Sequence, residues 1–283
     1  MIMDISHDFI KVIKLIDDKF EFPSVDKIFI PSQADLNSDR KKANFGAIKL
    51  TDGSTGIFFI GLDREFHEIA QKTDLAKLSK EDPVDLAYKF KEETLFDRTI
   101  GLGAINAISH FLFTRSNFQF TPSNHIINDI NVQRQDIIGM VGYFPPLVKK
   151  INLMGNKLVI VELKEELTKK TSNWEITLDT SRLAECNKII CTSTTLINNT
   201  LDNILNFTRD AKIFALIGPT AGFLPDPIFQ RKVDIIGGSI VNNSELFLER
   251  IVQGERWRDS VLKFVMKKET YPGIKNLIKL AEI

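Results

Sequence analysis

The chain has 283 residues, of which 43% are hydrophobic and 26% charged, so it is long enough to bury a hydrophobic core without disulfides. Its 37 basic residues balance 37 acidic ones, which argues against a nucleic-acid-binding protein, because such proteins usually carry a basic excess on one face. Two cysteines favour the reducing cytoplasm. The first residues, MIMDISHD, are acidic and have no basic n-region, so we expect no signal peptide. No apolar run approaches the ~20 residues of a membrane span, so we expect no membrane partner.

The first part of the chain predicts a helix followed by antiparallel strands. Ser6 can cap a helix whose apolar residues recur at helical spacing. A strand is expected at 25–30, and two more at 45–50 and 56–60. These two are joined around Asp52-Gly53, a pair that is typical of a hairpin turn.

The longest predicted helix, 95–113, contains four small residues at near-helical spacing: Gly101, Gly103, Ala104 and Ala107. Two glycines inside a helix cost up to ~1 kcal/mol each relative to alanine, so another element should pack closely against it. The helix is then either a tightly packed core element or one from which Asn106 points into a cleft.

A polar stretch at 115–135 separates this part from the rest, and we place a domain boundary there, with one domain at 1–122 and a second at 123–283. In the second domain, strands alternate with helices along the chain. Expected strands are 137–141, 157–163, 188–192, 212–217 and 233–236; expected helices are 145–153, 182–186, 196–207 and 244–253. This alternation predicts an α/β fold with a mainly parallel, doubly wound sheet. An edge strand at 257–267 and a helix at 272–283 complete it.

Ligands of such sheets bind at the carboxyl ends of the parallel strands, near the point where the strand order reverses. Four stretches lie at such ends: 142–145, Glu162, 192–195 and 218–220.

The first two stretches resemble a dinucleotide site in part. Glu162 follows Gly142 at about the spacing at which an acidic residue meets a ribose hydroxyl. The GxGxxG pattern is absent, however, and Pro145 and Pro146 lack the N–H groups that would hold a pyrophosphate. The sequence therefore argues against NAD or FAD in the usual Rossmann mode, and Glu162 is equally well read as a solvated acid.

The stretch 192–195 is richer in donors, since Thr192, Thr194 and Thr195 carry hydroxyls and every N–H is intact. If a helix begins directly after it, the aligned peptide dipoles favour a carboxylate or a phosphate. Asn198 follows within the first turn, and at the next strand end Gly218 and Thr220 offer a rigid turn and one hydroxyl. The alternative is that one hydroxyl caps the helix and the others face water.

Metal-binding signals are weak. Cys186 and Cys191 would face opposite sides of a shared strand, so they are poor joint ligands. The four histidines show no HxH or HxxxH spacing. A metal site built from oxygen ligands such as Glu162 remains an alternative.

Together, several stretches resemble the putative heavy-metal chelation family, a group of unknown function. They are DIIGMVGYFPPLV, KLVIVELK, KIICTSTTLINNTLDNIL, IFALIGPTAGFLPDPIF, VDIIGGSIV and, in the front half, TIGLGAINAIS. The resemblance implies a smaller α+β, enolase N-terminal-like domain with antiparallel strands, followed by a Rossmann-like domain. Ser193 and Ala221 depart from the family pattern, which has glycine and serine at these positions.

The resemblance also implies a pocket between the two domains. The matching positions are Asn106, Gly142, Tyr143, Glu162, Thr194, Thr195, Asn198, Gly218 and Thr220.

Two functions follow as hypotheses. The first is a cytoplasmic protein that binds a small polar or anionic ligand, including a metal ion or metal complex, in the interdomain pocket. The alternative is an enzyme that uses an adenosine-derived ligand, with Glu162 on the ribose and Tyr143 as a proton donor. A homo-oligomer is kept as an open alternative, and no nucleic-acid partner is expected.

Overall fold

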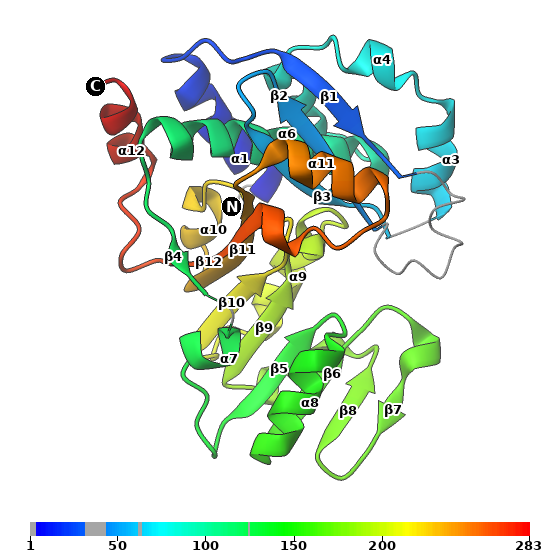
Figure 1. The fold of residues 1–283 in the computed structure, drawn as a ribbon. Coiled ribbons are helices and arrows are strands. Elements are labelled where there is room, and N and C mark those ends of the chain that lie inside the picture. Colours follow the sequence, from blue (N-terminus) through cyan, green and yellow to red (C-terminus); the bar gives the residue numbers. More distant parts are fainter. Residues whose placement is uncertain (1–3, 32–43, 62–63, 124) are drawn as a thin grey trace.

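The computed structural model describes residues 4–31, 44–61, 64–123 and 125–283. Within these residues, a three-stranded antiparallel sheet with its helices lies against one end of a nine-stranded sheet (Figure 1). We call the elements from α1 to α6 the front unit. They are α1 (Ile5–Asp17), β1 (Val25–Phe29), β2 (Phe45–Leu50), β3 (Thr55–Phe59), α3 (Arg64–Lys72), α4 (Leu75–Leu78), α5 (Pro83–Tyr88), the 3-10 helix η1 (Lys89–Lys91) and α6 (Leu95–Arg115).

The first helix begins two residues earlier than a Ser6 cap would allow. Asp4 is the cap, because its carboxylate accepts the Ser6 N–H at 3.1 Å and the Ser6 hydroxyl at 2.8 Å. Ser6 therefore lies inside α1 and is fully buried, and the expected Ser6 cap was wrong. A carboxylate is also the better partner for the positive end of the helix dipole.

The hairpin between β2 and β3 is confirmed. Asp52 accepts the Ser54 N–H at 2.9 Å and the Ser54 hydroxyl at 2.8 Å, and Gly53 takes a φ of +91°. Such a positive φ at the last position of a short hairpin loop is the conformation that glycine adopts without strain.

Close packing explains the glycines of α6, as the sequence predicts. A Cβ built on Gly101 would lie 2.1 Å from the backbone nitrogen of Phe90, and one on Gly103 would lie 2.6 Å from the Phe58 ring. From the other side, a Cβ on Gly56 of β3 would lie 2.0 Å from the Gly103 carbonyl oxygen. The backbone of α6 is therefore in direct contact with the backbones of β3 and η1.

The rest of the chain builds the large sheet, whose order is β4-β12-β11-β10-β9-β5-β6-β8-β7. Strands β5, β6, β8, β9, β10 and β11 are parallel, and β4, β7 and β12 pair antiparallel at the two sides. The elements are β4 (Thr121–Pro122), α7 (Ile126–Asp129), β5 (Ile137–Val141), α8 (Pro145–Met154), β6 (Lys157–Val161), η2 (Glu165–Leu167), β7 (Lys169–Lys170), β8 (Trp174–Thr177), η3 (Thr180–Glu185), β9 (Lys188–Thr192), η4 (Ser193–Leu196), α9 (Leu201–Phe207), β10 (Ile213–Ile217), α10 (Asp226–Phe229), β11 (Ile235–Val241), α11 (Ser244–Val252), η5 (Arg258–Ser260), β12 (Val261–Lys267) and α12 (Ile274–Ala281). The fold is thus α/β, as expected.

The structure differs from the expectations for this part in three places. The expected edge strand, β12, is covered on its outer side by β4, so it is not the edge. The short parallel strand β8 was missed, because its four residues follow a polar loop and carry little apolar pattern. The expected helix near 182–186 is the 3-10 helix η3.

The expected helix 196–207 is also broken in two. The 3-10 helix η4 ends near Leu196, Asn199 takes a left-handed φ of 55°, and α9 begins only at Leu201. The Thr200 N–H turns back to the Thr195 carbonyl at 3.0 Å, which closes the first turn and prevents its continuation. The argument for anion binding from a long helix dipole at Thr192–Thr195 therefore does not hold.

The strand order reverses between β5 and β9. The chain proceeds from β5 outwards to β6 and β8, then returns to the other side of β5 for β9, β10 and β11 (Figure 1). One hydrophobic cluster continues from the front unit into one face of the large sheet, and α7 and α8 cover the other face. None of the helices in the described ranges has the length and apolar character that crossing a membrane requires.

Candidate functional site

Helix α6 of the front unit lies across the carboxyl ends of the parallel strands, and Arg98 fixes its first half. The guanidinium donates from Nε to the Ile197 carbonyl and from Nη2 to the Leu196 carbonyl, both at 2.8 Å. Nη1 donates to the Phe90 carbonyl at 3.0 Å, and the side chain is 5% exposed. Arg98 therefore ties the front unit to the loop after β9.

Asn106 makes a second tie, two turns further along α6. Its Nδ2 donates to the Ile57 carbonyl at 2.8 Å and to the Thr220 carbonyl at 3.0 Å. Its Oδ1 is buried and has no hydrogen-bond partner among the described residues. Asn106 thus points at the loop after β10 and retains a free acceptor there, and the expectation that it points into a cleft stays a prediction.

The loops after β9 and β10 are joined by their hydroxyls. Ser193 and Thr220 share a hydrogen bond of 2.6 Å between their hydroxyl oxygens, and both side chains are almost fully buried. Gly218 makes this contact possible, since it has a φ of +150° and a Cβ on it would lie 2.3 Å from the Ser193 Oγ. Thr195 is buried as well, and its hydroxyl donates to the Thr192 carbonyl at 2.7 Å. These groups build the interior of the site.

The loops after β5 and β9 meet at the reversal of the strand order. Gly142 has a φ of +85°, and a Cβ on it would lie 3.1 Å from the Thr192 Cγ2. The Glu162 carboxylate fastens the same loop, because it accepts the Tyr143 N–H at 2.9 Å and the Leu163 N–H at 2.8 Å. Glu162 is therefore a positioning group for the backbone of Tyr143 as well as a partly open carboxylate.

Thr192 and Thr194 carry a second pair of hydroxyls at these strand ends. Both side chains are half-buried, their oxygens lie 2.9 Å apart, and Thr192 Oγ1 also accepts the Thr194 N–H at 3.3 Å. The pair has two hydroxyl protons and uses one between its own oxygens. The second proton is free to be donated outwards. Asn198 does not join the pair, since its Oδ1 accepts the Thr200 hydroxyl at 2.7 Å.

Two cavities lie near this end of the large sheet. The sheet-end cavity, of about 240 Å³, is lined by Phe144, Leu147, Gly218, Pro219, Ser239 and Lys263 among others, so it adjoins the loops after β5 and β10. The interunit cavity, of about 420 Å³, lies between the front unit and the end of β11 and is lined by Asp52, His110, Phe118, Phe120, Asn242 and Ser244 among others.

The lining of the interunit cavity contains none of the sequence-predicted site residues. It was missed because its polar groups come from positions near 52, 110 and 242 and form no local motif. One signal could have found His110, which follows Asn106 by one helical turn and so lies on nearly the same face of α6.

The described residues do not fit a protein-built cage for a soft metal. No group of three or more histidine, cysteine or acidic side chains comes together among them. Burial raises the pKa of Cys186 and of Cys191 to about 12, so both thiols are protonated near neutral pH, and both side chains are buried. The donors at the strand ends are hydroxyls, amides and the Glu162 carboxylate.

Fold and site together define a class of two-part α/β proteins, in which a smaller antiparallel unit covers the carboxyl ends of a mainly parallel sheet. The chain belongs to the DUF364 family, described as "Putative heavy-metal chelation", and residues 125–268 match the family.

Two solved structures share the fold over nearly the whole chain. A protein of unknown function from the DUF364 family of Pyrococcus horikoshii has a TM-score of 0.69 at 18% identity and covers 94% of this chain and 100% of its own. Another from Desulfitobacterium hafniense has a TM-score of 0.67 at 18% identity, with 91% and 96% covered.

Among curated proteins, the uncharacterized protein MJ0500 of Methanocaldococcus jannaschii is 28% identical over 149 residues. This match covers 47% of the present chain and spans 50% of the length of that relative.

Proposed function

We propose that this protein binds a small polar or anionic ligand at the carboxyl ends of β5 and β9, beneath α6. The observation that carries the proposal is the Thr192–Thr194 hydroxyl pair, which lies at the reversal of the strand order with one proton to donate. Doubly wound sheets bind their ligands at this point. We also place the protein in the cytoplasm, because its two cysteines are free and thiols stay reduced there.

The donor set indicates what kind of ligand suits the site. The hydroxyl protons of Thr192 and Thr194 recognise oxygen-rich molecules such as hydroxy acids or polyols. Since the described residues build no cage for a bare soft metal, we propose that a metal enters as a complex whose own ligands contact Thr192 and Thr194. This form of binding agrees with the description of the family.

An adenosine-derived ligand, used by an enzyme, is a second candidate that one observation favours. Glu162 is held at the end of β6 by two N–H donors, and its carboxylate oxygens keep lone pairs for a ribose hydroxyl. Tyr143, whose N–H it binds, would then be the proton donor. A pyrophosphate has less support, because α8 begins at Pro145 and Pro146, which have no N–H to donate.

Thermal unfolding with a panel of citrate, ferric citrate, adenosine and nickel chloride tests the proposal. We expect citrate or ferric citrate to raise the Tm saturably, because a ligand at 100 times its Kd stabilises the fold by ~2.7 kcal/mol. The Thr192→Val/Thr194→Val protein should lose this shift. The Thr270→Val protein, altered at an exposed threonine, should keep it.

Each outcome of this panel has a defined meaning. A response to adenosine alone supports the enzyme alternative, and a response to nickel chloride alone contradicts the argument against a protein-built metal cage. If no compound changes the Tm, or if the double variant responds as the wild type does, the proposed site is wrong.

A further inference from the structure

The interunit cavity is separate from the site proposed above and has its own polar groups. It lies where the β2–β3 hairpin and the end of α6 meet the end of β11 and the first residue of α11. Its volume of about 420 Å³ falls within the range of cavities that enclose small molecules.

His110 supplies a directed hydrogen-bond donor. The Thr55 N–H donates to its Nδ1 at 2.9 Å, and the Thr55 carbonyl lies 3.3 Å from the same nitrogen. A backbone N–H can only donate, so the shorter of these two contacts assigns Nδ1 as the acceptor. Burial lowers the pKa of His110, so the ring is neutral near pH 7 and carries its proton on Nε2. Nε2 has no hydrogen-bond partner in the described part of the chain, and the ring lines the cavity. Its proton is therefore available to an acceptor atom of a ligand.

Asp52, an exposed residue, supplies a negative charge to the lining of the same cavity. It is the charged residue of the described lining, and no lysine or arginine lies beside it there. Its two oxygens accept the N–H and the hydroxyl of Ser54, which orients the carboxylate but does not neutralise it. A cation such as an ammonium group is the complementary partner.

Three phenylalanines form an apolar wall. The ring centroids of Phe113, Phe118 and Phe120 lie 4.9 to 5.1 Å apart in mutual contact, and all three rings line the cavity. Phe118 and Phe120 are half-buried, so part of their apolar surface is available for contact with an apolar side chain.

We infer that the interunit cavity binds a free α-amino acid with an apolar side chain. Its ammonium group pairs with Asp52, its carboxylate accepts from the His110 Nε2 and from the amide of Asn242, and its side chain packs on the phenylalanine wall. The three chemical groups of such a ligand match the three kinds of group in the cavity. The inference does not depend on the function proposed for the strand ends.

Isothermal titration with L-phenylalanine and L-leucine tests this inference. Saturable binding of at least one is expected. N-acetyl-L-phenylalanine lacks the ammonium and phenethylamine lacks the carboxylate, so each should bind at least about tenfold more weakly than L-phenylalanine. The Asp52→Asn protein should show a similar loss. It keeps an oxygen acceptor for the Ser54 N–H and a turn residue suited to the hairpin, so its fold is preserved.

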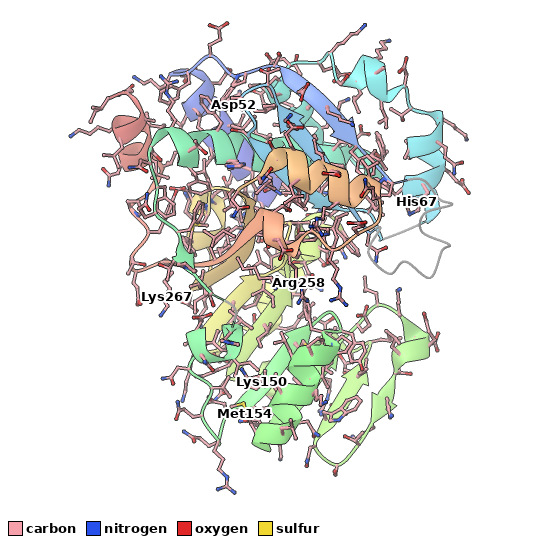
Figure 2. The ribbon with its side chains drawn as sticks, in the orientation of Figure 1. Asp52, His67, Lys150, Met154, Arg258 and Lys267 are labelled. Carbon is pink, nitrogen blue, oxygen red and sulfur yellow. The ribbon has the colours of Figure 1, made fainter. Side chains whose placement is uncertain are left out.

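A second variant and a control complete the test. His110→Gln should weaken carboxylate binding, and if that protein does not fold, Asp52→Asn and the two analogues still decide. Lys150→Ala changes α8, which lies at the far end of the molecule from Asp52 (Figure 2), and should bind as the wild type does. The inference is overturned if neither amino acid binds at millimolar concentration, if the N-acetyl compound binds equally well, or if Asp52→Asn has no effect.

Discussion

Asn106 and Thr220 are 114 positions apart in the sequence and are joined by a hydrogen bond of 3.0 Å from the amide Nδ2 to the backbone carbonyl. The same amide nitrogen donates to the Ile57 carbonyl at 2.8 Å. One buried side chain therefore connects β3, α6 and the loop after β10. The position of the front unit over the strand ends depends on it.

We expect Asn106→Ala to lower the free energy of unfolding by about 2 kcal/mol or more, because two carbonyls would lose a buried donor. Urea unfolding followed by circular dichroism measures this value. Asn203→Ala, on the exposed side of α9, is the matched control and should change it by less than about 0.5 kcal/mol. Equal effects of the two substitutions would mean that the Asn106 contacts carry no stability.

Arg98→Lys should also destabilise the protein, by about 2 kcal/mol, although it keeps the positive charge. A lysine ammonium cannot reproduce the planar fork that reaches the carbonyls of Phe90, Leu196 and Ile197. The exposed Arg209→Lys provides the comparison in the same urea experiment. If Arg98→Lys proves as stable as wild type, the guanidinium geometry is not what holds α6 to the loop after β9.

Gly142 and Gly155 allow two effects of a glycine to be separated. Both have a left-handed φ, +85° and +77°, but a Cβ on Gly142 would lie 3.1 Å from Thr192, whereas one on Gly155 would meet nothing within 4 Å. Each change to alanine should cost about 1 kcal/mol for the backbone conformation. Gly142→Ala should cost more than that and should also weaken ligand binding at Thr192. Equal Tm values for the two variants would refute the crowding at the strand ends.

His110 should make stability depend on pH. Burial holds its pKa below the ordinary value of about 6.5, so the unfolded chain binds a proton that the folded protein refuses. The stabilisation is complete above about pH 6.5 and is lost as the pH falls from there towards the lowered pKa of the folded state. The slope cannot exceed about 1.4 kcal/mol per pH unit for one proton. The charge of Asp52 raises the pKa of His110 and so offsets part of the effect of burial.

Unfolding in urea at a series of pH values between 5 and 8 measures this slope, in an approximate range set by the ordinary histidine pKa. The His110→Gln protein should lack the His110 contribution, so the difference between wild type and variant should shrink as the pH falls. A constant difference across the range would show that His110 is protonated equally in both states.

The fold was largely predictable because local patterns encode most of it. The prolines at 145 and 146 begin α8 as predicted, and the close packing of α6 follows from its small residues. The helix after Thr195 was wrong because Asn199 adopts a left-handed φ there, a conformation that asparagine tolerates but does not require. The domain boundary at 122 stays a prediction, and Thr121–Pro122 pairs with β12 in the large sheet.

The site was predictable only where its residues follow strands in a recognisable pattern. Gly142, Thr192 and Gly218 were predicted in this way. The structure brings their loops together, and their role in binding stays a prediction. The hydrogen bond between the Ser193 and Thr220 hydroxyls joins two separate segments and leaves no pattern in the sequence. The interunit cavity escaped prediction for the same reason.

The most direct measurement is a crystal structure of the protein with the panel compound that raises the Tm most. Our account predicts electron density for that compound beside the Thr192 and Thr194 hydroxyls, between the loop that begins at Gly142 and the front unit. Density elsewhere in the molecule, with both hydroxyls in contact with water alone, would contradict it.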